Sequence, residues 1–175
     1  MTIRRLLVAT VLFACVATAH AVTYEGTTAG GDPWNRPLEG EPPTALSAIG
    51  TAVPFTVTPF TVSVSGNYVF ISQALVPLNW DNFTFLYQGS FDAAAPLTNV
   101  LIGNDDFDSS IGLSGFTHVL TTGTSYFFIT TGFSNSSLGT YSNSIIGPGQ
   151  VVIPGPIFVD GFESASTSAW SVSHP

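Results

Sequence analysis

Three carboxylates fall within four positions of the segment "IGNDDFDSS": Asp105, Asp106 and Asp108, with Asn104 just before them. Calcium binds six to eight oxygen atoms supplied by carboxylates, amides and carbonyls of a flexible loop, so these four residues are candidate ligands. Like charges this close also favour a bound cation if the loop is compact. The alternative is a solvated polar turn, because Asn and Asp side chains bond to nearby backbone in turns. The segment predicts a polar turn first and a calcium loop second.

The same carboxylates could do acid–base chemistry on a glycan. Glycosidases hold two carboxyl groups about 5 Å or about 6.5–9.5 Å apart in a cleft. Adjacent aspartates on a short turn lack a cleft that would separate their pKa values. His118 would need a nucleophile and an orienting acid, and "GLSGF" is not the Gly-x-Ser-x-Gly segment of a hydrolase. We therefore expect His118 to be a packed or half-exposed strand residue and predict no catalytic residue.

Aromatic side chains offer a second kind of site, because they can stack on sugar rings or pack against a proline-rich polymer. Trp34, Trp80 and Tyr87 are the candidates for such a binding surface. Trp80, in the turn "PLNWDN", is the one most expected near the surface. The alternative is that these residues fill the core of a protein without disulfides.

The elements that position these residues are predicted to be β-strands. Apolar residues alternate with period two, whereas helical spacing is almost absent after the first 21 residues. The segments "PFTVSVSG" and "NYVFISQAL" join across Ser65-Gly66-Asn67, which predicts a hairpin. The second segment is apolar on both faces, as an inner strand would be. About seven to eight strands with regular turns predict an all-β antiparallel sandwich or jelly roll.

The first 21 residues have the parts of a secretory signal: a basic start, an apolar stretch over 6–16 and a small-x-small site ending at Ala21. We expect cleavage after Ala21 and a location that is extracellular, periplasmic or at the cell surface. A rival interpretation has Cys15 lipidated, although Phe13 fits that pattern poorly. The apolar stretch is shorter than the roughly 20 residues that span a bilayer, so no membrane span is expected.

Four segments are expected along the chain. They are a signal peptide over 1–21, a mostly irregular lead-in with room for one strand over 22–50, a β-sandwich domain over 51–149, and a linker with a C-terminal tail over 150–175. The 154 residues that follow the predicted signal peptide suit one domain with a substantial core.

Removing the signal leaves eleven acidic residues and one basic residue, Arg36, a formal charge of −10. Nucleic acids and anionic lipids bind clustered Lys or Arg, so these partners are excluded. Cys15 is the single cysteine and leaves with the signal. The mature chain is therefore expected to have no disulfide, no thiol nucleophile and no cysteine metal site.

Four motifs occur in order between Tyr24 and Gly149: "SGNYVF", "FTFLYQGSFDAAAPLTNVLIGNDD", "HVLTTGTSYFFITTGF" and "GTYSNSIIGPG". In this order they resemble the bacterial pre-peptidase C-terminal domain. The resemblance implies a secreted, non-catalytic β-sandwich, with relatives that bind calcium or an extracellular polymer such as collagen. Such domains are usually appended to an enzyme, and we expect no enzyme domain within this sequence. The segment "FVDGFESASTSAW" is similar to a short DGFES-type tail of secreted bacterial proteins.

Together these features predict a secreted, non-catalytic module for extracellular binding or surface association, with calcium as the one candidate cofactor. Its partner would be an extracellular polymer, a glycan or a protein. Two alternatives stay open: a small hydrolase or glycan-active enzyme that uses Asp105 and Asp106, and a structural envelope or matrix protein. An enzyme requires carboxylates that converge with His118 in a cleft. A binding module requires an exposed aromatic patch or a metal loop, and a structural protein requires neither.

Overall fold

The computed structural model describes residues 19–154, so most of the predicted signal peptide and the predicted tail from 155 onward lie outside the described residues. The described chain consists of strands and loops with one short 3₁₀ turn, η1 (Phe107–Ser109). The strands are β1 (His20–Thr27), β2 (Pro33–Trp34), β3 (Val53–Pro54), β4 (Thr56–Val62), β5 (Gly66–Val76), β6 (Asn82–Gln88), β7 (Val100–Asn104), β8 (Leu113–Leu120), β9 (Tyr126–Gly132), β10 (Thr140–Gly147) and β11 (Val151–Val152). This confirms the all-β class.

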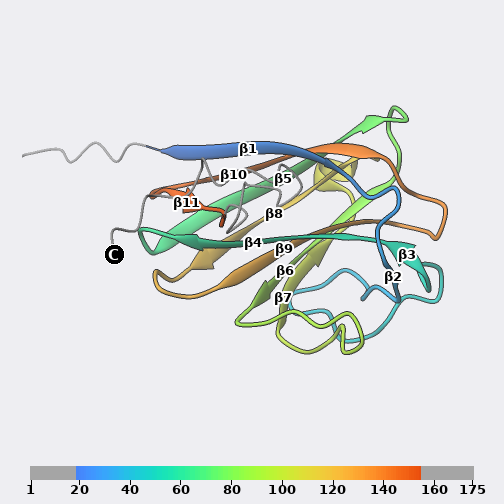
Figure 1. Ribbon diagram of the computed structural model, residues 1–175, viewed down its shortest axis with the longest axis horizontal. Helices are drawn as coiled ribbons and strands as arrows, with labels where there is room; N and C mark the ends of the chain where they lie inside the picture. The colour runs from blue at the N-terminus through green and yellow to red at the C-terminus, as the bar shows by residue number, and fades with distance from the viewer. Residues whose placement is uncertain (1–18, 155–175) are drawn as a thin grey trace, which may run out of the picture.

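The strands form two facing antiparallel sheets (Figure 1). One sheet has the order β1-β10-β5-β8 and the other the order β11-β4-β9-β6-β7, while β2 and β3 form a separate short pair. Except for β6 and β7, consecutive long strands lie in opposite sheets. This alternation is the strand order of a jelly roll, in which two Greek keys wrap into a sandwich. The predicted antiparallel sandwich is therefore confirmed.

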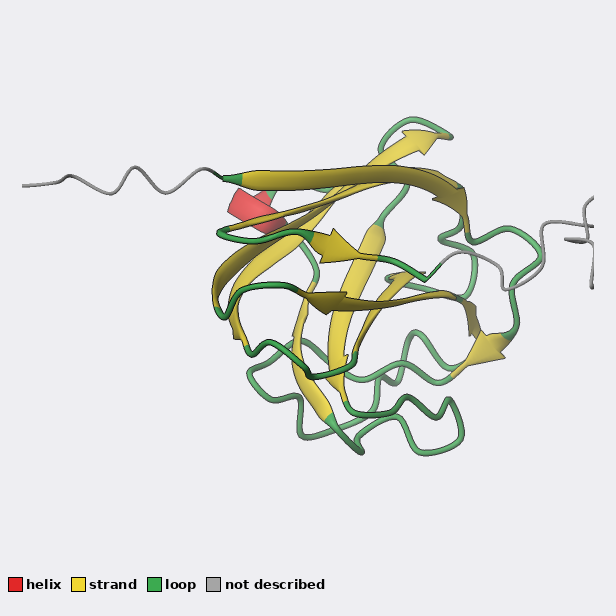
Figure 2. Cartoon of the chain, turned by 60° about the vertical axis from the view of Figure 1, so that its left-hand side comes forward, coloured by secondary structure: helices red, strands yellow, loops and turns green. Residues whose placement is uncertain are grey.

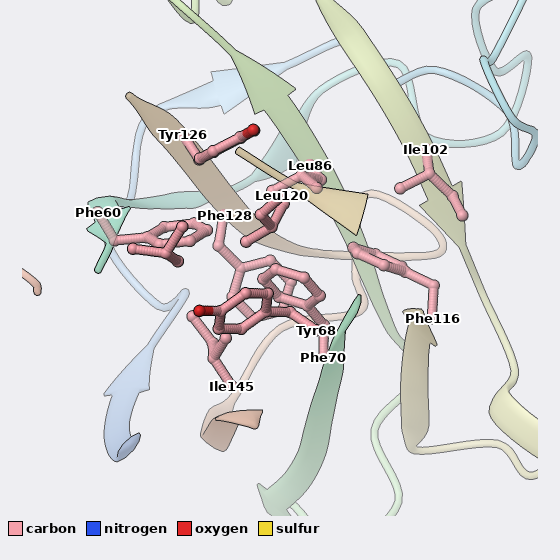
Figure 3. Packing of buried hydrophobic residues seen from close by; sticks show 11 residues of the cluster. Phe60, Tyr68, Phe70, Leu86, Ile102, Phe116, Leu120, Tyr126, Phe128 and Ile145 are labelled. Atoms are coloured by element: carbon pink, nitrogen blue, oxygen red, sulfur yellow. The ribbon is translucent and has the colours of Figure 1, made fainter. Parts of the chain in front are cut away.

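The main core lies between the two sheets and is largely aromatic (Figure 3). Strands with period two send alternate side chains inward, and Phe70 of β5 and Phe128 of β9 meet there from opposite sheets with ring centroids 5.1 Å apart. Phe116 of β8 lies 5.0 Å from Phe70. Buried aromatic rings contribute large apolar areas, which stabilises this domain without a disulfide.

A second apolar cluster covers the outer face of the five-stranded sheet. Phe83, Phe85 and Tyr87 of β6 point away from the main core and pack in one cluster with Trp34 of the short strand β2 and Phe91 of the β6–β7 loop. Strand β6 is thereby buried on both faces. Figure 2 shows these long loops gathered along one side of the strands. Among residues 19–154, the outer face of the four-stranded sheet carries no such layer, and its outward side chains are mostly partly or fully exposed.

The hairpin predicted across Ser65-Gly66-Asn67 is wrong. Strand β4 pairs with β9, and β5 pairs with β10 and β8, so this connection crosses from one sheet to the other. Alternation determines which side chains face the core, but it does not determine which strand becomes the hydrogen-bonded neighbour. Phe60 and Phe70 accordingly meet across the core, with ring centroids 5.9 Å apart.

The sandwich extends beyond its predicted limits of 51 and 149 at both ends. All eight residues of β1, which lies largely in the predicted lead-in, pair with β10. Strand β11, in the predicted linker, pairs with β4. The rest of the lead-in is irregular apart from β2, yet it is held in place because Trp34 and Arg36 are buried. The lead-in is a structural part of the domain.

Candidate functional site

Three carboxylates converge where two loops meet at one end of the sandwich. Asp81 precedes β6, and Asp105 and Asp106 follow β7, which pairs with β6 as far as Thr84 and Asn104. One carboxylate oxygen from each aspartate lies within 4.8 Å of the other two. Antiparallel neighbours place the start of one strand beside the end of the next, so the β6–β7 pairing brings these residues together.

Two of the four predicted ligands join this group, and two do not. Asp105 and Asp106 are members. Asp108 lies in η1 with a positive φ of 54° and is exposed, outside the group. The side-chain oxygen of Asn104 accepts a hydrogen bond from the Gly115 N–H at 3.1 Å, so it anchors the loop on β8. Asp81 was not predicted, because it is far from the acidic segment in the sequence.

The oxygens of this group are poorly satisfied by the protein. Oδ1 of Asp105 and Oδ1 of Asp106 are buried, and neither has a hydrogen-bond partner among the described residues. A buried acceptor without a partner costs about 1–3 kcal/mol, and more when it is charged. This is the feature that a bound cation would relieve.

Burial raises the pKa of the Asp105 carboxyl from 3.8 to about 7, with further contributions from the negative charges of Asp81 and Asp106. The pKa of Asp81 is also raised, first by burial and then by Asp106. The positive charge of Arg36 opposes both shifts. The site therefore resists holding three negative charges on its own.

Arg36 is a buried cation beside this group, with 1% of its surface exposed. Its guanidinium lies over the Phe83 ring, 4.2 Å from the centroid, and donates to the carbonyl oxygens of Phe133 and Pro37. Within residues 19–154 it forms no ion pair with an aspartate at 4 Å or less. If all three aspartates are ionised, they and Arg36 together carry a charge of −2.

His118 is paired with Glu41 and is not a member of the group formed by Asp81, Asp105 and Asp106. Its Nδ1 is 3.3 Å from Oε1 of Glu41, and its side chain is 21% exposed. Glu41 belongs to the lead-in, which is also bridged to β7 through Gly40 and Gly103. His118 thus contacts the lead-in as a strand residue, and the carboxylate group does not include it.

The predicted aromatic binding surface is wrong. Trp34, Trp80 and Tyr87 are 3%, 6% and 0% exposed. Each buried polar group of these rings has a partner, as aromatic residues with a polar atom require: Trp34 Nε1 donates to Thr131 Oγ1, Trp80 Nε1 to the Thr140 carbonyl and the Tyr87 hydroxyl to the Pro96 carbonyl. Trp34 and Tyr87 belong to the apolar cluster on the outer face of the five-stranded sheet. Trp80 packs instead against Ala74 of β5 and Tyr141 of β10, in the four-stranded sheet.

The fold defines the chain as an antiparallel β-sandwich with jelly-roll strand order. No protein-family model matches the chain, and no curated protein matches it. Among solved structures, the chain is similar to the crystal structure of Aeromonas hydrophila PliG, a periplasmic lysozyme inhibitor of g-type lysozyme. The identity is 11% and the TM-score 0.38, over 82% of this chain and 93% of that one.

These comparisons do not test the resemblance to the pre-peptidase C-terminal domain, which stays a prediction from the residues. Among residues 19–154, no helix is long and apolar enough to cross a membrane.

Proposed function

We propose that this chain is a secreted, non-catalytic module for extracellular binding or surface association, in which calcium held by Asp81, Asp105 and Asp106 stabilises one loop end. The observation that carries the proposal is the convergence of three carboxylate oxygens within 4.8 Å, two of the residues each having a buried Oδ1 without a partner. The partner class is an extracellular polymer, glycan or protein.

Calcium fits this site better than the other common ions do. Its ligands are oxygen atoms on flexible loops, and here all three side chains are carboxylates on two loops. Zinc favours nitrogen and sulfur ligands, whereas the group contains neither a histidine nor a cysteine. Magnesium demands near-ideal octahedral geometry and keeps several waters. A divalent cation would also balance the charge of −2 that ionised Asp81, Asp105 and Asp106 carry together with Arg36.

The enzymatic alternative receives less support from this geometry. A glycan-active enzyme needs one carboxyl that donates a proton and a second at a defined separation across the scissile bond. The spread of 4.8 Å is near the separation of about 5 Å in one class of glycosidase, but a third carboxylate shares the site, and His118 lies beside Glu41 instead. The arrangement favours ion binding over acid–base chemistry at Asp105 and Asp106.

The test is thermal unfolding of the chain that begins at Val22, in calcium and in chelator. An ion that binds only the folded state stabilises it by about 2.7 kcal/mol at 100 times its Kd. For a domain of this size, that corresponds to a rise in Tm of roughly 5–10 °C. The Asp81→Asn variant should lose most of the rise, because it removes the negative charge that the second loop contributes to the site.

Asp108→Asn is the matched control, since Asp108 lies on the same acidic segment but outside the carboxylate group. It should keep the full calcium response. A calcium response that survives Asp81→Asn but disappears in Asp108→Asn would move the site to another part of the loop. If the wild-type chain showed no response to calcium, the acidic segment would be a polar turn without a bound ion.

A further inference from the structure

The outer face of the four-stranded sheet is a broad surface that the described chain leaves uncovered. The strand registers place Ile146 of β10, Val69 of β5 and Thr117 of β8 in one cross-strand row. The next row contains Ser144, Ile71 and Gly115. The middle of the face is therefore aliphatic at Val69, Ile71 and Ile146, with Ser, Thr and Gly beside them.

Strand β5 is apolar on both of its faces, although one face is open. Its inward side chains Tyr68 and Phe70 are fully buried, whereas its outward Val69 and Ile71 are only partly buried. On the neighbouring strands, Ile146 is 38% exposed and Val119 of β8 is 62% exposed. In contrast, β6 of the other sheet has both faces covered. An apolar face in the middle of a sheet is normally packed against another layer.

The charge distribution indicates which kind of layer can approach. Residues 19–154 contain nine acidic side chains, and Glu25 of β1 is the one that lies on this face. The other eight are in the lead-in and the loops. Two copies of a chain with a formal charge of −10 repel each other, and a face with one acidic side chain adds little to that repulsion at the contact. The outward positions of β1, β5, β8 and β10 include no aromatic residue, so the face offers no stacking platform for a sugar ring.

The size of the face suits a second copy of the same sheet. Four strands of about eight residues span roughly 19 Å by 26 Å, or about 500 Å² per copy. Two such faces bury about 1,000 Å², which is the lower limit for a specific protein–protein interface. Sheets of this kind pack face to face in sandwiches, with their side chains interdigitated.

We propose that two copies of this chain pair through the outer faces of their four-stranded sheets, with Val69, Ile71 and Ile146 at the centre of the contact. The pairing is independent of the proposed calcium site, because Asp81, Asp105 and Asp106 lie on loops outside this face. Salt should strengthen the pairing, since it screens the repulsion between two acidic chains.

The test is the molar mass of the chain beginning at Val22, measured by analytical ultracentrifugation from micromolar to millimolar concentration, in calcium and in chelator. We expect a dimer that dissociates on dilution and strengthens with salt in both conditions. Ile146→Glu should weaken it by roughly tenfold or more, because it sets two like charges against each other across the contact. Leu78→Glu is the matched control: Leu78 is 80% exposed on the β5–β6 loop, off this face, and its variant should still dimerise. Circular dichroism would verify that both variants fold.

Three results would overturn the proposal. The first is a monomer at every concentration and salt level. The second is a dimer that Ile146→Glu leaves unchanged or that Leu78→Glu weakens equally. The third is a full chain that stays monomeric while a chain ending at Pro154 dimerises, because the tail and not a second copy would then occupy the face.

Discussion

Asp105 makes the stability of the metal-free protein depend on pH. The folded state binds the proton of Asp105 up to about pH 7, whereas the unfolded chain releases it near 3.8. The contribution of Asp105 to the free energy of unfolding is therefore complete below about pH 4 and is lost as the pH rises to about 7. In chelator, we expect the wild-type protein to lose stability over this range relative to Asp105→Asn, which cannot ionise. Urea unfolding of both proteins across the range measures the difference.

Asp92→Asn serves as the control for this comparison, since Asp92 lies on the β6–β7 loop outside the carboxylate group. Its stability should follow that of the wild-type protein with pH. Parallel curves for the wild-type protein and Asp105→Asn would contradict a buried, proton-binding Asp105.

Asp105 and Asp106 could be identified from the sequence, whereas Asp81 could not. The first two stand side by side, so their joint charge is visible locally. Asp81 joins them only because β6 and β7 pair, and pairing depends on the whole sheet. A signal was nevertheless present in the sequence, because Asp81 stands just before the alternating segment "NFTFLY" and Asp105 just after the apolar segment "VLIG". If consecutive strands pair, those two positions meet.

At the scale of the elements, Trp34 holds the lead-in against the five-stranded sheet. Its ring contacts Phe55, Phe85 and Phe91, with centroids 5.3–5.6 Å away. Trp34→Ala should cost about 3–5 kcal/mol of unfolding free energy, as truncation of a buried Trp usually does. Urea unfolding measures the loss, and hydrogen exchange should show faster exchange of the Arg36 and Leu38 backbone amides, which donate to Gly50 and Ala45.

Leu38→Ala is the corresponding control, because Leu38 belongs to the same segment but is 44% exposed. It should cost clearly less than Trp34→Ala. If Trp34→Ala left stability unchanged and abolished binding to an extracellular polymer, the result would support the sequence-based prediction that Trp34 belongs to a binding surface.

The class of fold could be predicted from the sequence, whereas the segments that cover the outer face of each sheet could not. Period-two alternation at β4, β5 and β6 identifies strands and their two faces because side chains alternate across a strand. It does not identify what covers each face. Phe83, Phe85 and Tyr87 are buried by loops, while Val69 and Ile71 have no cover within residues 19–154. For this reason the exposed aromatic surface expected from the sequence was wrong at Trp34 and Tyr87, whereas Trp80 is buried against Ala74 and Tyr141.

At the scale of the whole molecule, the predicted cleavage after Ala21 would remove the first two residues of β1, so its effect on folding can be measured. A chain that begins at Val22 keeps six of the eight β1–β10 pairs and the packing of Val22 and Tyr24 against the core. We expect it to fold cooperatively. A chain that begins at Thr28 loses the strand and should be less stable by roughly 3 kcal/mol or more, from the lost apolar burial. Urea unfolding compares the two chains. Equal instability of both would mean that His20 and Ala21 are needed for the native sheet.

The two ends of the described chain leave the sandwich away from its carboxylates. The start of β1 pairs with Gly147 at the end of β10, and β11 pairs with Val62 at the end of β4 (Figure 1). Asn82, next to Asp81, pairs instead with Gly132 at the end of β9, from which the chain leads to the start of β10. Asp81, Asp105 and Asp106 lie at the other pole. A tether at either end of the described chain would therefore orient the acidic loops away from the surface to which the domain is attached. The same polarity makes the domain suitable for immobilisation by its ends, with the carboxylate group left free in solution.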